Sequence, residues 1–172
     1  MKTLIASTII GFVLITSCAN AQDSIQFSSP VISIGLVTTN LDQSLAFYKD
    51  VIGMIEVRQF DASAEFATKI GLTNNMPASV HVLKLEDSKA ATEWKVMSFG
   101  KPATHPQQNY VHDDTGMQYL TIMVNSLTSL MERFKKHNIK LLGSTPHQVG
   151  ENRFIVTVQD PDGNFVELIG SM

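Results

Sequence analysis

Residues 160–169 read Asp160-Pro161-Asp162-Gly163-Asn164-Phe165-Val166-Glu167-Leu168-Ile169. Aspartate, proline and glycine favour tight turns, because proline presets a negative φ and glycine readily adopts a positive one. The apolar residues that follow are typical of a strand, in which Glu167 alternates with Val166 and Leu168. The run therefore predicts a turn into a final strand whose Glu167 side chain points away from the core.

A strand followed by a helix is predicted at residues 31–53. Residues 31–38 are apolar and rich in β-branched side chains, which favours a buried strand. Asn40 is a suitable helix N-cap, and Gln43, three residues later, completes a capping-box pattern. Apolar residues then follow at helical spacing up to Gly53, which is predicted to end the helix in the left-handed conformation.

The second half of the chain repeats this pattern. Residues 118–124 predict a strand, Asn125 is the matching N-cap, and Asn138 is a suitable left-handed end of the helix. Residues 139–142 are predicted to begin the next strand. Because the equivalent positions are related by one constant offset along the sequence, we infer an internal duplication.

Each half continues with further strands and so has the order βαβββ. The additional strands are predicted at residues 54–60, 80–85 and 94–99 in the first half and at residues 154–158 and 165–169 in the second. The first half also carries an extra helical segment at residues 62–72. The sequence thus predicts an α+β fold of two tandem modules, at about residues 31–100 and 117–170, joined by a linker at residues 101–116.

The N-terminal residues 1–21 are predicted to be a signal peptide, followed by a polar lead at residues 22–30. Lys2 precedes an apolar run from Leu4 to Ile15 that is too short to span a bilayer comfortably. Two processing sites remain open: cleavage after Ala21, or a lipobox ending at Cys18, which would then carry a lipid. We expect an exported chain that is periplasmic, membrane-anchored through that lipid, or secreted.

The composition excludes several classes of protein. With 44% hydrophobic and 17% charged residues in 172, the chain is typical of a folded globular domain and not of a disordered one. The net charge is −3 and no basic patch stands out, so we expect no nucleic-acid partner. Cys18 is the only cysteine, which excludes a disulfide within the domain.

The paired modules and the run at residues 160–169 closely resemble the vicinal-oxygen-chelate superfamily of glyoxalases, bleomycin-resistance proteins and extradiol dioxygenases. Residues 45–48 and 51–54, Leu-Ala-Phe-Tyr and Val-Ile-Gly-Met, match that family's first helix and the segment that follows it. The resemblance covers about residues 31–170. It implies curved sheets around a central cavity, a small-molecule ligand and a homodimer. In metal-using members it also implies four ligands, on the first and last strands of each module.

The resemblance places those four ligand positions on Ser33, Lys95, Tyr119 and Glu167. Only Glu167 is a good ligand for a hard divalent cation, and a protonated lysine has no lone pair to donate. Strand alternation independently puts Ser33, Tyr119 and Glu167 on the face opposite their apolar neighbours. The register of Lys95 stays open, because a slip of one residue would present Val96 instead.

We expect the Lys95 ammonium to stand where the ion would be and to pair with Glu167, because an isolated buried carboxylate is costly. The candidate catalytic residues are thus Glu167, Lys95 and Tyr119. The candidate ligand-binding residues are Ser33, Trp94, Met97 and Thr121. The residues do not supply a full metal ligand set, so a divalent metal cofactor is disfavoured but stays open. A structural relic that only satisfies polar groups is the alternative.

Three functions remain open on the sequence alone. The first is a glyoxalase-like protein that acts on or binds a small oxygen-rich molecule through a degenerate metal site. The second is a non-catalytic, drug-sequestering protein of the bleomycin-resistance type. The third is a divalent-metal lyase, isomerase or dioxygenase whose ligands lie at other positions.

Overall fold

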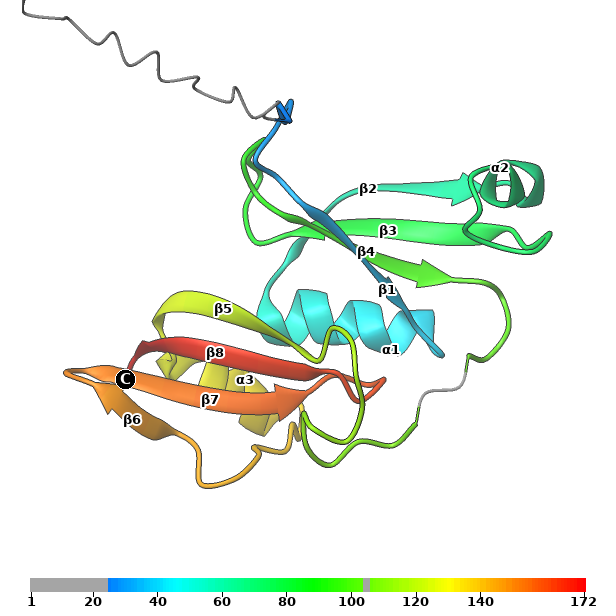
Figure 1. The fold of residues 1–172 in the computed structure, drawn as a ribbon. Coiled ribbons are helices and arrows are strands. Elements are labelled where there is room, and N and C mark those ends of the chain that lie inside the picture. Colours follow the sequence, from blue (N-terminus) through cyan, green and yellow to red (C-terminus); the bar gives the residue numbers. More distant parts are fainter. Residues whose placement is uncertain (1–24, 104–105) are drawn as a thin grey trace, which may run out of the picture.

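The structure is a computed structural model that describes residues 25–103 and 106–172 (Figure 1). The predicted signal peptide and the lipidation site at Cys18 lie outside these residues. In the part of the chain that is described, no helix is long and apolar enough to cross a membrane.

Two four-stranded mixed sheets form the fold. Sheet A has the order β1-β4-β3-β2 and sheet B the order β5-β8-β7-β6. In each sheet the first and last strands, β1 with β4 and β5 with β8, pair in parallel, and the other neighbours are antiparallel. The strands of sheet A are β1 (Ser33–Val37), β2 (Ile55–Ala62), β3 (Ala78–Lys84) and β4 (Glu93–Ser98). Those of sheet B are β5 (Tyr119–Ser126), β6 (His147–Gly150), β7 (Arg153–Gln159) and β8 (Phe165–Ser171).

The same strand order therefore occurs twice, and the predicted α+β fold of tandem βαβββ modules is confirmed. We call the segment from β1 to β4 module 1 and the segment from β5 to β8 module 2. The helices are α1 (Leu41–Ala46), which continues as the π-helix η1 (Phe47–Ile52), α2 (Ala64–Lys69) and α3 (Thr128–Lys136).

The first helix begins and ends as the sequence predicts. The Asn40 side chain accepts a hydrogen bond from the Gln43 backbone N–H at 3.1 Å. Gly53 ends η1 with a φ of 98°, a left-handed conformation that costs glycine little.

The second helix differs from the prediction at its start. Asn125 is not the cap: α3 begins at Thr128, and the Ser126 hydroxyl accepts from the Thr128 N–H at 3.2 Å. The Asn125 carbonyl instead accepts a hydrogen bond from Ser171 of β8, because β5 continues through this position. The predicted stop at Asn138 is confirmed by its φ of 55°.

The strand predicted at residues 139–142 is also wrong. These residues are apolar at alternate positions, but only the Leu142 N–H bonds to β7, at the Thr157 carbonyl (2.8 Å). The edge of β7 pairs instead with β6, which begins at His147, eight residues after Ile139. Ile139 and Leu141 serve as packing residues against the core.

One hydrophobic core joins the two modules. Its buried members come from both sheets and from the helices between them: Leu36, Phe47, Tyr48, Val51, Ile52, Met54, Leu83, Trp94 and Val96 of module 1, and Ile122, Leu127, Leu130, Phe134, Val156, Val158, Val166 and Leu168 of module 2. Figure 1 shows α1 between the two sheets. Each sheet therefore turns one face to this shared core, and we call its other face the outer face.

The turn at residues 160–163 fastens module 2 to the first helix of module 1. The Asp162 carboxylate accepts hydrogen bonds from the Thr39 N–H (2.9 Å), the Thr39 hydroxyl (2.7 Å) and the Ser44 hydroxyl (3.0 Å). The Tyr48 hydroxyl donates to Asp160 at 2.7 Å. Burial raises the pKa of the Asp160 carboxyl, and burial followed by the Asp160 charge raises the pKa of Tyr48, so the Tyr48 hydroxyl keeps its proton and donates a hydrogen bond to Asp160.

Candidate functional site

A cavity of about 500 Å³ lies on the outer face of sheet A. β1 and β4 pair in parallel with Ser33 beside Glu93, Gly35 beside Lys95 and Val37 beside Met97, and paired residues share a face. The cavity is bounded by these strands, by β2 and β3, and by α2 with the loop after it. Its lining residues are Ser33, Gly35, Val37, Phe60, Ala62, Phe66, Ala67, Ile70, Leu72, Thr73, Ala78, Val80, Lys95, Met97 and Phe99.

Most of this lining is apolar. Phe66 of α2 and Ile70, which directly follows α2, line the cavity together with Val80 and Met97 on the strands. Gly35 leaves room in the floor of the cavity, since a Cβ there would lie 3.3 Å from the Met97 sulfur, closer than most such contacts. The cavity is thus shaped by a missing side chain on β1 and by the extra helix of module 1.

One end of the same face is polar and charged. The Glu93 carboxylate accepts a hydrogen bond from the Ser33 hydroxyl at 2.9 Å and from the Arg58 guanidinium at 3.1 Å. The Lys95 ammonium, which lines the cavity, lies 3.9 Å from the same carboxylate oxygen. The Ser33 hydrogen bond, and then the charges of Arg58, Lys95 and Lys84, hold the pKa of Glu93 below its usual range against the opposing effect of burial.

Three of the predicted site residues, Ser33, Lys95 and Met97, meet in this cavity. The register of Lys95 is settled, because its neighbour Val96 is fully buried in the shared core on the opposite face. Sequence reasoning missed Glu93 and Arg58. Glu93 lies two residues before Lys95 and so carries the alternation signal of a strand face, which would have found it.

Trp94 is not part of this cavity. It alternates with Lys95, so its ring lies in the shared core, 5.5 Å from the centre of the Tyr48 ring. It lines a separate cavity of about 280 Å³ between the modules, together with Ile34 and Leu120. Trp94 and Met97, both predicted to bind ligand, therefore line different cavities of one chain, because residues at odd spacing along a strand point to opposite faces.

Tyr119 and Glu167 lie in module 2 and line none of the cavity on sheet A. Thr121 is paired in register with Glu167, and its hydroxyl donates to the Glu167 carboxylate at 2.8 Å. The Tyr119 side chain is 56% exposed on the outer face of sheet B.

The expected pair of Lys95 and Glu167 is not formed within the chain. Over residues 25–103 and 106–172, the ion pairs connect Lys95 with Glu93 only. The reason is the shared core: because both sheets turn their apolar faces to it, their outer faces point away from each other.

The side chains at the four positions do not fit a divalent metal ion. Ser33, Lys95, Tyr119 and Glu167 supply one carboxylate, and a protonated lysine cannot coordinate. In the described part of the chain, no three His, Cys, Asp or Glu side chains lie close enough together to hold a metal. We therefore derive no chemistry through a metal.

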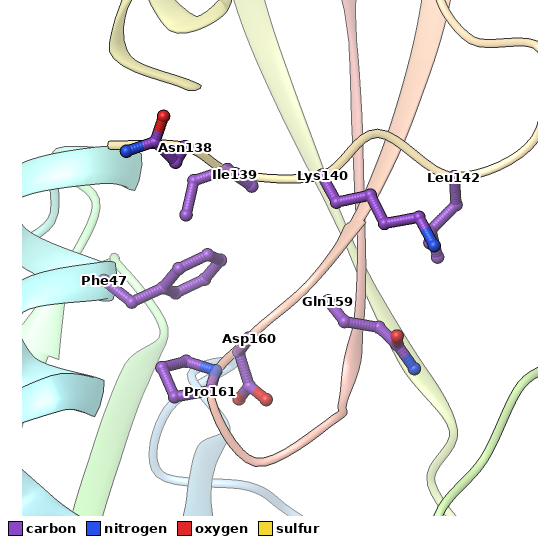
Figure 2. Close-up of a pocket in the computed structure, with 8 residues that line it drawn as sticks. All are labelled: Phe47, Asn138, Ile139, Lys140, Leu142, Gln159, Asp160 and Pro161. Atoms are coloured by element: carbon purple, nitrogen blue, oxygen red, sulfur yellow. The ribbon is translucent and has the colours of Figure 1, made fainter. Parts of the chain in front are cut away.

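Another hollow, of about 280 Å³, lies at the junction of the modules (Figure 2). Figure 2 shows Phe47 of η1 facing Ile139 and Pro161 of module 2. Two of its polar residues have partners: Asp160 accepts from Tyr48 and Asn164, and the Gln159 amide donates to the carbonyls of Gln108 and Gly163. This hollow lies at the seam between the modules.

Two βαβββ modules of identical strand order, packed through their helices, define the paired-module class of α+β proteins. The chain belongs to the Glyoxalase/Bleomycin resistance protein/Dioxygenase superfamily, whose sequence model matches residues 31–168. Members of this superfamily often bind small molecules and form dimers. A comparison with curated proteins found no match.

Solved structures confirm the likeness in fold. A glyoxalase family protein from Bacillus cereus superposes with a TM-score of 0.73 and 14% identity, over 88% of this chain and 99% of that one. The trypanothione-dependent glyoxalase I of Leishmania major gives a TM-score of 0.58 and 19% identity, over 83% and 87%. Glyoxalase I from Zea mays gives 0.56 and 20%, over 81% of this chain and 43% of the maize chain. At these identities the likeness shows the fold alone.

Proposed function

We propose that this chain is an exported, glyoxalase-like protein that binds a small oxygen-rich organic molecule in the cavity on the outer face of sheet A. The observation that supports this proposal is the cavity itself, which at about 500 Å³ has the size of small-molecule sites and is mainly apolar with a few polar groups at one end. Binding needs only these groups. The ancestral metal positions are proposed to be degenerate, with Lys95 in place of a ligand.

A combined ligand and metal experiment tests this proposal. Thermal-shift measurements on the purified, processed protein with dicarbonyls, hydroxy acids, catechols and drug-like aromatics should find ligands that raise the Tm, since a ligand that binds only the folded state stabilises it. Product analysis of each hit then separates sequestration from turnover. Elemental analysis should show no stoichiometric divalent metal; tight metal that is lost in Glu167→Ala would favour a metalloenzyme instead.

The cavity is best tested by filling it. Gly35→Leu places a large side chain against Met97 in the cavity floor, and ligand binding should be lost while the far-UV circular dichroism stays that of the parent. Gly143→Leu is a poor control because Gly143 has a φ of 60°. Gly150→Leu in β6 of sheet B is a better one, because Gly150 does not have a positive φ and a Cβ there would lie 3.6 Å from its nearest neighbour. Retained binding in Gly35→Leu would place the ligand elsewhere.

We also propose a homodimer in which sheet B of one copy covers the cavity of the other. Tyr119 and Met123, 56% and 61% exposed, flank Thr121 and Glu167 on the outer face of sheet B, an exposure unusual for large apolar side chains on a strand. Such pairing would bring Glu167 towards a partner's Lys95. Sedimentation should give a dimer that Met123→Asp dissociates, whereas a monomeric parent would refute the pairing.

Export is proposed from residues 1–21 and is tested by mass. Intact mass spectrometry of the chain from a bacterial host should show either a start at Gln22 or a lipid-modified Cys18. Cys18→Ala should abolish the lipid-modified form and leave the first form unchanged. Recovery of the full-length chain in the cytoplasm would refute export.

A further inference from the structure

Beside the cavity, the outer face of sheet A carries more positive than negative charge, and of these charged residues Lys95 lines the cavity itself. Arg58 of β2 and Lys95 of β4 both reach the single Glu93 carboxylate, at 3.1 Å and 3.9 Å. Lys84 adds a third positive charge near enough to lower the pKa of Glu93. A second anionic group placed here would therefore gain attraction from cations that one carboxylate leaves under-compensated.

The positions of the two cations differ in a way that suits a ligand. The Arg58 guanidinium donates to both Glu93 oxygens and lies 5.7 Å from the centre of the Phe60 ring, so it already has partners on this face. The Lys95 ammonium makes only the long 3.9 Å contact, is 30% exposed, and its side chain lines the cavity. Lys95 is thus the cation with hydrogen-bonding capacity to spare, and it faces the apolar space.

We propose that the ligand of this cavity is a small organic carboxylate with an apolar, ring-sized body. The carboxylate binds the Lys95 ammonium beside Arg58, and the body lies between the side chains of Phe66 and Ile70 and the strand residues Val80 and Met97. This inference rests on the proposed function and narrows it to one ligand class. The Glu93 carboxylate competes with the ligand carboxylate for Arg58 and Lys95.

Matched probes separate charge from shape. We would titrate the purified, processed protein with 3-phenylpropionate and with 3-phenylpropanamide, which have the same body but differ in charge, and follow binding by ligand-observed NMR. The acid should bind about tenfold more tightly than the amide, since a hydrogen bond to a charged partner is worth more than a neutral one. The preference should shrink as salt is added, because the site is partly open to solvent.

Variants that remove either the positive charge of Lys95 or the negative charge of Glu93 test the role of each charge in binding. Lys95→Met keeps the length of the side chain and should abolish the preference for the acid, while Lys95→Arg should keep it, which guards against a folding artefact. Glu93→Gln should strengthen binding of the acid several-fold and leave the amide unchanged. Lys136→Met removes the same charge on exposed α3 and should change neither affinity.

The possible failures are distinguishable. Equal binding of acid and amide, or a preference that survives Lys95→Met, overturns the carboxylate inference and leaves the proposed binding function standing. If neither probe nor any compound of the thermal-shift panel binds, both proposals fail.

Discussion

Asp162 shows how one side chain can hold two modules together. It belongs to the turn before β8, yet its three hydrogen bonds go to Thr39 and Ser44 at the start of the first helix. Burial pushes the pKa of Asp162 up, but hydrogen bonds from Thr38, Thr39 and Ser44 outweigh burial and lower it below its usual range. The folded chain therefore favours the ionised carboxylate.

Replacing Asp162 by Asn should destabilise the fold by about 2 kcal/mol at pH 7, because hydrogen bonds to a charged acceptor are lost. Since the folded-state pKa is the lower one, the stabilisation is fully present above the ordinary aspartate pKa and disappears as the pH falls through the folded value. Urea unfolding of parent and variant should thus converge in acid. Asp87→Asn, at an exposed loop position, is the control; a difference that does not depend on pH would contradict this account.

The sequence predicted some residues of the candidate site but not Arg58, and the irregular pairing of β2 explains the difference. Ser33 and Lys95 followed from strand alternation together with the resemblance. Arg58 did not, because β2 changes register between Glu56 and Arg58. A bulge inserts a residue that reverses the in-and-out pattern beyond it, and nothing in the local sequence marks it.

Among the elements, the pairing of β5 with β8 depends on a close approach at Gly170. A Cβ at this position would lie 2.6 Å from the Val124 carbonyl oxygen, and backbone cannot move away as a flexible side chain can. Gly170→Ala should therefore destabilise the protein by about 1–3 kcal/mol, the usual cost of overpacking. Gly150→Ala in β6, where the nearest atom lies 3.6 Å away, should cost much less in the same urea unfolding experiment.

The elements were also predictable to different degrees. Strands with clear alternation and the helix capped by Asn40 are present close to their predicted places, because these signals are local. The start of α3 and the strand at residues 139–142 were predicted wrongly, because both depend on pairing with residues distant in sequence. β5 continues beside β8 past Asn125, and β6 rather than residues 139–142 pairs with the edge of β7. Local patterns favour an element, and tertiary pairing decides its limits.

For the whole molecule, the shared core implies that the modules are not independent. Phe134 of α3, 2% exposed, belongs to the same core cluster as Trp94 of β4. A loss of packing in module 2 therefore also lowers the stability of module 1. The cavity on sheet A then depends on module 2 for its stability, even though no residue of module 2 lines it.

Trp94 of β4 is the single tryptophan of the chain, so its fluorescence reports on the packing of the shared core around β4. Phe134→Ala should cost about 3–5 kcal/mol by leaving a cavity in the core, and we expect it to shift the unfolding transition seen by Trp94 fluorescence as much as the one seen by far-UV circular dichroism. Val149→Ala, at a half-exposed position of β6, should shift neither. If the Trp94 transition stayed in place while the circular dichroism split into two steps, the modules would be unfolding separately, and the cavity could then be stable without module 2.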